Sequence, residues 1–367
     1  MTETPARLPW IVLVGGFLGA GKTSLIFSAA RILARRGLRS AAILNDQGGE
    51  LVDRRHAESQ GLLAREVTGG CFCCRFSDLQ SRIEELRSRT PDIIFAEPVG
   101  SCTDLAATVL GPLRETFHEY RIAPFTVLVD PSRAAALLGP GTDSDLAFLF
   151  KKQLQEADLV CLTKSDRYPN AVAIPDVPTR RVSAATGQGV EAWLDEILLD
   201  GRIHGARILD IDYARYAQAE AALAWLNLSF VLESDLAITP AFAIGPLLDG
   251  LDLALTGAGI EIVHLKLFAS SASGWIKAAI CGSGDEPRLE GTLDASSSAR
   301  HQLLVNLRAI GDPAEVREVV STQLRKMSGR VLDVHLDCFS PAAPQPERRI
   351  EAAQLWLAGQ GAKLRTA

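Results

Sequence analysis

The sequence predicts an α/β protein in which a mostly parallel β-sheet with helices on both faces is followed by a smaller, ferredoxin-like α+β domain. Between residues 10 and 199, short apolar runs alternate with amphipathic stretches, as in parallel sheets whose strands are joined by helices. From residue 222 onward the expected order becomes β-α-β-β, an extra strand, and then α-β. With 367 residues, the chain is long for one core and suits two.

In the first part, the apolar runs predict buried strands, and Gly, Pro, Ser, Thr or Asp residues bound the amphipathic stretches between them as helix ends. The expected strands cover residues 11–14, 40–44, 92–96, 125–129, 159–163 and 181–183. The expected helices cover residues 22–36, 78–89, 104–115, 145–156 and 190–199.

The second part is predicted in the same way, with strands at residues 222–232, 260–269, 275–281, 302–308 and 331–338 and helices at 240–255 and 313–326. Three prolines at 341, 344 and 346 then precede a short expected helix at 348–357. Glycines and a polar stretch after residue 200 indicate a linker. The predicted division is a first domain at 1–205, a linker at 206–220, a second domain at 221–340 and a tail at 341–367.

Composition excludes several classes of protein. Apolar residues make up 47% and charged residues 22% of the chain, which is ordinary for a globular protein. The net charge of −6 gives no electrostatic basis for binding nucleic acid or an anionic membrane. No signal peptide and no apolar stretch of about 20 residues is found, so a cytoplasmic location is predicted. Seven cysteines in a reducing compartment favour metal or redox chemistry over disulfides for any cluster.

The sequence Gly-Phe-Leu-Gly-Ala-Gly-Lys-Thr at residues 16–23 follows the first expected strand and predicts a phosphate-binding loop. Glycines let backbone N–H groups converge on a polyphosphate, and the following helix directs its positive end at the same anion. Lys22 would reach the β- and γ-phosphates, and Thr23 would ligate Mg²⁺. The alternative is a chance glycine-rich turn. The predicted nucleotide contacts of this P-loop NTPase domain are Gly16, Gly19, Gly21, Lys22, Thr23 and Ser24.

The base of the nucleotide is predicted from Thr163-Lys164-Ser-Asp166, at the carboxyl end of an expected strand. A carboxylate at Asp166 can accept hydrogen bonds from N1–H and N2–H₂ of guanine, whereas adenine has an acceptor at N1. Ser183 and Ala184 fit a loop whose backbone N–H supports guanine O6. The alternative is that Thr163 to Asp166 form an ordinary polar loop that does not read a base.

A carboxylate for the metal half of the nucleotide site is predicted at Glu97, which ends another expected strand and precedes Gly100 by three residues. Such an acidic residue organises Mg²⁺ and the attacking water, and the glycine senses the γ-phosphate. A helix-capping role for Glu97 is the alternative. The Gly-containing loop at residues 45–49 lies in the position of a first switch, or is a plain polar turn.

Three cysteines within four residues, Cys71, Cys73 and Cys74, follow a glycine pair. Thiolates suit Zn²⁺, Cu(I) and other thiophilic metals, and three protein ligands leave one coordination position open for transfer. Buried apolar cysteines and a purely structural metal site remain as alternatives. Cys102, Cys161, Cys281 and Cys338 are expected to be isolated core residues. Candidates for a fourth ligand are His56, Glu50 and Glu66.

The P-loop at 15–24 and the Gly-Gly-Cys-Phe-Cys-Cys at 69–74 resemble the CobW-like metallochaperone GTPases, relatives of the urease and hydrogenase nickel-insertion GTPases. The resemblance includes the Glu-x-x-Gly at 97–100 and the base loop at 163–166, and extends to the second domain by element order. It implies GTP hydrolysis with Mg²⁺, binding of Zn²⁺ or Co²⁺ by the three cysteines, and nucleotide-controlled delivery to a client metalloprotein, a metal-insertion enzyme or a cobalamin pathway.

The chain departs from that family at residues 45–49, where an aromatic and an acidic side chain are replaced by Gln47 and Gly49, and it lacks a His-rich loop. Two further functions stay open: a GTP-dependent regulatory switch with a structural metal site and a client-docking second domain, and an ATP-dependent kinase. A homodimer stays open beside a monomer.

Overall fold

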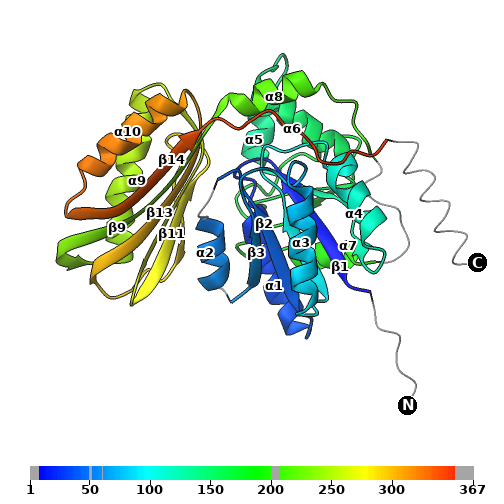
Figure 1. The fold of residues 1–367 in the computed structure, drawn as a ribbon, viewed down its shortest axis with the longest axis horizontal. Helices are drawn as coiled ribbons and strands as arrows, with labels where there is room; N and C mark the ends of the chain where they lie inside the picture. The colour runs from blue at the N-terminus through cyan, green and yellow to red at the C-terminus, as the bar shows by residue number, and fades with distance from the viewer. Residues whose placement is uncertain (1–7, 49–51, 60, 200–206, 352–367) are drawn as a thin grey trace, which may run out of the picture. The chain divides into compact units, whose positions relative to one another are not determined.

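The computed structural model describes residues 8–48, 52–59, 61–199 and 207–351 (Figure 1). The chain divides into two compact units. Unit 1 comprises the described residues of Met1–Asp46, Ala57–Tyr216 and Pro344–Ala367, and unit 2 those of Gln47–His56 and Ala217–Ala343. Within the described part of the chain, no helix combines the length and apolar character required to cross a bilayer.

Unit 1 is built on a parallel β-sheet, as predicted. The strands are β1 (Trp10–Gly16), β2 (Ser40–Asn45), β3 (Leu63–Val67), β4 (Ile93–Glu97), β5 (Arg121–Ile122), β6 (Thr126–Val129), β7 (Leu159–Leu162) and β8 (Thr179–Arg181). Their order is β3-β2-β4-β1-β6-β7-β8, with β5 also paired to β1, and every pair is parallel. β1 and β4 are continuous apolar runs because helices cover both faces of such a sheet.

The helices of unit 1 are α1 (Lys22–Arg35), α3 (Phe76–Arg87), the π-helix η1 (Ala106–Leu110), α4 (Gly111–Thr116), α5 (Pro131–Leu137), α6 (Asp145–Glu156) and α7 (Val190–Ile197). Two further helices, α2 (Val52–Ser59) and α8 (Tyr213–Ala221), each contribute residues to both units. The core of unit 1 joins β1 to α1 and α7 through residues such as Val12, Leu25 and Trp193. The Trp193 indole N–H is also satisfied, because it donates to Thr126 Oγ1 at 3.1 Å.

The parallel arrangement brings the ends of four strands to one edge of the sheet. Neighbouring strands β3, β2, β4 and β1 end at Val67, Asn45, Glu97 and Gly16, respectively. Ligands bind at this carboxyl edge in open α/β sheets. The segments that follow these four strands are therefore the ones that form the candidate site.

Unit 2 contains an antiparallel sheet and two long helices. Its elements are β9 (Leu223–Ile238), α9 (Pro240–Gly257), β10 (Glu261–Ser271), β11 (Gly274–Ile280), β12 (Arg288–Gly291), β13 (Ser298–Ile310), α10 (Pro313–Arg325) and β14 (Arg330–Phe339). The strand order β10-β13-β9-β14 is that of a ferredoxin-like sheet, which β11 and β12 extend at one edge. α9 and α10 pack against one face of it (Figure 1). The predicted fold class is therefore confirmed.

Several elements differ from the sequence prediction. β3, α2 and α5 were not expected; β3 is an edge strand whose first four residues are only partly buried, so its polar side chains obscure the strand pattern. The expected helix at 104–115 is a π-helix followed by a short α-helix. α8 occupies part of the predicted linker. The predicted linker glycines lie outside the described residues, as does most of the expected helix at 348–357, of which residues 348–351 are not helical.

Candidate functional site

The loop between β1 and α1 has the backbone that a phosphate-binding loop requires. Gly16, Gly19 and Gly21 all have positive φ, at 128°, 77° and 90°. A side chain at Gly16 would place its Cβ 2.4 Å from the Leu128 carbonyl oxygen, so glycine is required there. No side chain caps the first turn of α1, and its N–H groups are left for another acceptor.

Lys22 and Thr23 connect this loop to the end of β4. The buried Lys22 ammonium donates to the Gly16 carbonyl at 2.9 Å, and the Thr23 hydroxyl donates to Glu97 Oε1, also at 2.9 Å. Gly100 packs so closely that an added Cβ would lie 3.0 Å from Lys22 Nζ. Glu97 therefore contacts the P-loop through Thr23. The oxygens of Thr23 and Glu97 are hard ligands of the kind that Mg²⁺ takes, so these residues fit that ion.

The predicted base-reading residues lie at the carboxyl ends of the adjacent strands β7 and β8. Lys164 has a left-handed backbone, with φ of 54°, and its ammonium forms an ion pair with Asp130. The exposed Asp166 follows in the same turn. Ser183 N–H donates to the Gln188 carbonyl at 2.9 Å, which closes the second loop. The two loops are joined by a hydrogen bond from Ser165 N–H to the Val182 carbonyl at 3.2 Å.

The segment at residues 69–75, termed here the Cys loop, leads from β3 to α3 and brings three sulfur atoms together. The Sγ atoms of Cys71 and Cys73 are 2.8 Å apart, and Cys74 Sγ lies 3.3 and 3.6 Å from them. Sulfurs bound to one tetrahedral zinc at about 2.3 Å are separated by about 3.8 Å, so a modest spreading would accommodate an ion. Cys71 and Cys73 are buried and Cys74 is partly exposed.

Cys102 is a buried core residue, as predicted, but it is not isolated, because its thiol interacts with Cys71. A hydrogen bond from the Cys102 thiol to Cys71 is the largest of the effects that hold the pKa of Cys71 well below its usual value, followed by hydrogen bonds from Cys73 and Cys74. Hydrogen bonding to Cys71 raises the pKa of Cys73, and that of Cys74 to about 11. Among the three cysteines of the Cys loop, Cys71 is therefore the one whose ionisation is favoured. Cys161, in contrast, is fully buried within β7, as predicted.

Asn45 fixes the Cys loop to the end of β2. Its side-chain amide donates to the carbonyls of Val67 and Gly70 at 2.9 and 2.8 Å, and its Oδ1 accepts the N–H of Phe72 at 2.8 Å. The sequence placed Asn45 at the start of a first switch but gave no sign of this contact. One amide therefore connects the predicted switch to the three cysteines.

The segment after β14 returns to unit 1 and runs along the Cys loop. The N–H of Gln345 donates to Cys74 Sγ at 3.2 Å, and the N–H of Glu347 donates to the Cys73 carbonyl at 2.9 Å. The Glu347 carboxylate accepts the Ser77 N–H at 2.8 Å. The sequence predicted only a tail here, because the contacts with Cys73 and Cys74 are made by backbone N–H groups of this segment.

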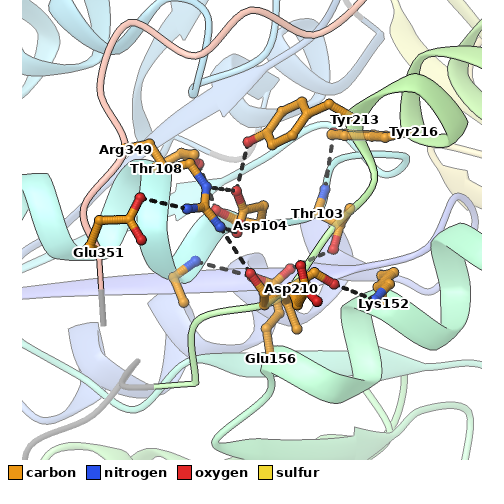
Figure 2. Close-up of polar contacts among 12 residues, drawn as sticks. Thr103, Asp104, Thr108, Lys152, Glu156, Asp210, Tyr213, Tyr216, Arg349 and Glu351 are labelled. Carbon is orange, nitrogen blue, oxygen red and sulfur yellow. Dashed lines mark hydrogen bonds and ion pairs between the residues drawn. The ribbon is translucent and has the colours of Figure 1, made fainter. Parts of the chain in front are cut away.

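A buried polar network holds the chain immediately after Cys102 (Figure 2). Asp104 has a φ of 61° and accepts hydrogen bonds from Tyr213 at 2.6 Å and Arg349 at 2.8 Å. Glu156 accepts from the Thr103 hydroxyl and from the Ala106 N–H, both at 3.0 Å. Because Glu156 is fully buried, desolvation raises its pKa to about 8.

Neither of the described candidates for a fourth ligand, His56 and Glu66, joins the sulfur cluster. His56 has its two ring nitrogens at Lys277 and Glu290, 3.2 and 3.4 Å away, and burial lowers its pKa to about 4. Glu66 lies on β3, and Glu50 lies outside the described residues. Of the described His, Cys, Asp and Glu side chains, the three cysteines form the group that converges closely enough for an ion.

Comparison with known proteins agrees with this geometry. Residues 10–187 match the family model described as CobW/HypB/UreG, nucleotide-binding domain. This part of the chain is a CobW/HypB/UreG nucleotide-binding domain. The resemblance predicted from the motifs is confirmed, and the CobW/HypB/UreG domain contains both the P-loop and the Cys loop.

Curated relatives carry metal-related names. The chain is 30% identical to the zinc chaperone YjiA of Escherichia coli K12 over 166 residues, 42% of this chain and 49% of YjiA. It is 31% identical to the zinc chaperone CobW of Pseudomonas aeruginosa over 200 residues, 45% of this chain and 51% of that protein. The chain thus spans about half the length of these relatives. The crystal structure of HypB from Helicobacter pylori in complex with nickel matches with a TM-score of 0.40 and 17% identity, covering 52% of this chain and 86% of HypB.

Replacing Asn45 tests whether its hydrogen bonds position the Cys loop. Asn45→Ala removes three hydrogen bonds, two of them buried, and leaves two carbonyls and one N–H without this partner, so we expect a loss of about 1–3 kcal/mol in the free energy of unfolding. We also expect faster modification of the cysteines by a thiol reagent under anaerobic conditions. Asn170→Ala, at an exposed turn, is the matched control. Unchanged thiol reactivity in Asn45→Ala would show that the amide does not position the loop.

Glu156 makes stability depend on pH. The folded protein keeps the proton of this carboxyl up to about pH 8, whereas the unfolded chain loses it near 4.5. This contribution to stability is therefore complete below pH 4.5 and is lost as the pH rises to about 8. Glu156→Gln preserves a neutral group, so its unfolding temperature should fall less than that of the wild type between pH 5 and 8. Glu286→Gln, at an exposed site, should follow the wild type, and equal slopes in all three proteins would refute the assignment.

Proposed function

We propose that this protein is a GTP-hydrolysing metallochaperone that binds a thiophilic transition metal, Zn²⁺ or Co²⁺, and delivers it to a client protein under nucleotide control. The observation that carries the proposal is the arrangement at the carboxyl edge of the sheet. The P-loop, Glu97 and the Cys loop follow the ends of neighbouring strands, and the Asn45 amide ties the Cys loop to the strand between them. The names of the curated relatives support the same class of function.

In the nucleotide half, the backbone N–H groups of the P-loop and the first turn of α1 would bind the phosphates. Lys22 would leave the Gly16 carbonyl to contact the β- and γ-phosphates. Thr23 and Glu97 would hold Mg²⁺, which neutralises charge on the phosphates when bound. Gly100, packed against Lys22, would contact the γ-phosphate through its backbone. Positioning and charge neutralisation supply most of the catalysis of phosphoryl transfer, so slow turnover without a partner is expected.

In the metal half, Cys71, Cys73 and Cys74 would bind the cargo ion. Cys71, whose pKa is lowered by its neighbours, would lose its proton first, and the ion would then displace protons from Cys73 and Cys74. Soft thiolate donors favour zinc or another thiophilic metal over Mg²⁺. Cys74 is the partly exposed member, and it offers the side from which a client could take the ion.

The triple replacement of Cys71, Cys73 and Cys74 by Ser separates delivery from a structural metal site. We expect this variant to stay folded, to hydrolyse GTP, and to lose binding of one Zn²⁺ per chain by anaerobic titration. Lys22→Ala should do the reverse, with hydrolysis lost and Zn²⁺ still bound. The opposite result has two parts: the triple variant unfolds, and wild-type protein hydrolyses GTP at the same rate with and without metal. That result would favour the alternative of a regulatory switch with a structural metal site.

Asp166 determines the preferred base in this proposal. Asp166→Ala removes the acceptor for guanine N1–H and N2–H₂, so we expect at least a tenfold weaker affinity for GTP. A competition assay with labelled GDP against ATP in both proteins measures the change. Asp176→Ala, at another exposed turn residue, is the control. If ATP competes as well as GTP in the wild type, the protein is not a GTPase and the kinase alternative is favoured.

A further inference from the structure

The segment at residues 344–350, termed here the strap, lies along the Cys loop within unit 1. It forms neither a helix nor a strand, and prolines stand at positions 341, 344 and 346. Each proline fixes its own φ at about −65° and favours an extended backbone in the residue before it. A chain restricted in this way loses less conformational entropy when it is ordered, so a small number of contacts is enough to hold it in place.

The strap places a hydrogen-bond donor on the partly exposed member of the cysteine group. Proline has no backbone N–H, so in Pro344-Gln345-Pro346 only the backbone of Gln345 can donate. This N–H donates to Cys74 Sγ at 3.2 Å. Cys74 is partly exposed, whereas the other two cysteines of the Cys loop are buried. The one backbone donor of this stretch is therefore used on the sulfur atom that solvent can reach.

Glu347 attaches the strap to the Cys loop and to the helix that follows it. Its N–H donates to the Cys73 carbonyl at 2.9 Å, and its carboxylate accepts the N–H and the hydroxyl of Ser77 at 2.8 and 3.1 Å. Arg75, the residue before α3, makes no capping hydrogen bond to this helix with its side chain. The Glu347 carboxylate fills that role from the strap, where its negative charge also suits the positive end of the helix.

Arg349 and Ile350 fasten the far end of the strap to other parts of unit 1. Arg349 donates to the Asp104 carboxylate at 2.8 Å (Figure 2). The Ile350 N–H donates to the Ala107 carbonyl at 3.0 Å, and Ile350 is only 5% exposed. It packs so closely on Gly111 that an added Cβ there would lie 1.8 Å from Ile350 Cδ1. None of these contacts involves the cysteines of the Cys loop, so they hold the strap whether or not an ion is bound.

We propose that the strap retains the bound ion: the Gln345 N–H holds the Cys74 sulfur in its ligating position, and the strap moves aside when the ion passes to a client. This inference rests on the proposed binding of a thiophilic metal and adds how the ion is kept and where it leaves. A backbone N–H that donates to a ligating thiolate orients the sulfur and stabilises its negative charge. Gln345 is thus a positioning residue that acts through Cys74, and release of the ion requires that this hydrogen bond be broken.

The first test follows the transfer of Zn²⁺ from the full-length, anaerobically purified protein to a coloured chelator. Gln345→Pro removes the N–H and Gln345→Ala keeps it, so the two variants form a matched pair at an exposed position. We expect Gln345→Pro to release zinc at least about tenfold faster than the wild type, because the loss of a contact that orients a metal ligand weakens binding by about that factor. Gln345→Ala should release zinc at the wild-type rate.

A second test needs no metal. In metal-free protein, the rate at which iodoacetamide alkylates Cys74 is measured by mass spectrometry. Glu347→Ala detaches the strap from Ser77, so we expect Cys74 to react at least about fivefold faster than in the wild type. Glu286→Ala, at an exposed site of unit 2, is the matched control and should react at the wild-type rate.

The outcomes are distinct. Zinc release at the wild-type rate in Gln345→Pro, or equal acceleration in Gln345→Pro and Gln345→Ala, would overturn the role of the Gln345 N–H and leave the proposed function intact. Unchanged alkylation in Glu347→Ala would show that the strap does not guard the Cys74 sulfur. Wild-type protein that binds no zinc would overturn both the inference and the proposed function. Circular dichroism and binding of a fluorescent GDP analogue check the fold of each variant, and Glu347→Ala tests the strap even if Gln345→Pro does not fold.

Discussion

The parallel order of β3, β2, β4 and β1 is the constraint on which the candidate site depends. It forces the segments that follow these four strands onto one edge of the sheet, where a phosphate loop, a carboxylate and a cysteine loop lie side by side. The Asn45 amide then donates to Val67 at the end of β3 and to Gly70 of the Cys loop, and accepts from Phe72 of that loop. A change in position at the end of β2 therefore cannot leave the sulfur cluster unaffected.

A second connection between the P-loop and the cysteines runs through the end of β4. Glu97 accepts a hydrogen bond from Thr23 of the P-loop, and the same segment continues to Cys102, whose thiol interacts with Cys71. The Cys loop thus contacts the end of β2, and β4 is the strand between β2 and β1, which leads into the P-loop. Nucleotide control of metal affinity needs such a two-state element in contact with both ligands, and the segment from Glu97 to Asp104 is the candidate for that element.

Local motifs were readable from the sequence, whereas contacts between distant segments were not. The P-loop and the Cys-x-Cys-Cys could be predicted because their chemistry lies in a few consecutive residues beside an apolar strand. Cys102 was expected to be a lone core residue, since its approach to Cys71 depends on how two loops after non-adjacent strands fold over the sheet edge. The left-handed Asp104 and the half-buried β3 escaped prediction for a similar reason: tertiary contacts override their local preference.

The central claim is that the nucleotide and the metal are thermodynamically linked through this edge of the sheet. The most direct measurement is the zinc dissociation constant of the wild-type protein with a non-hydrolysable GTP analogue and with GDP, at the same magnesium concentration. The account predicts constants that differ by at least about fivefold, with zinc changing the ratio of the two nucleotide affinities by the same factor. Identical zinc affinities in both nucleotide states would contradict it.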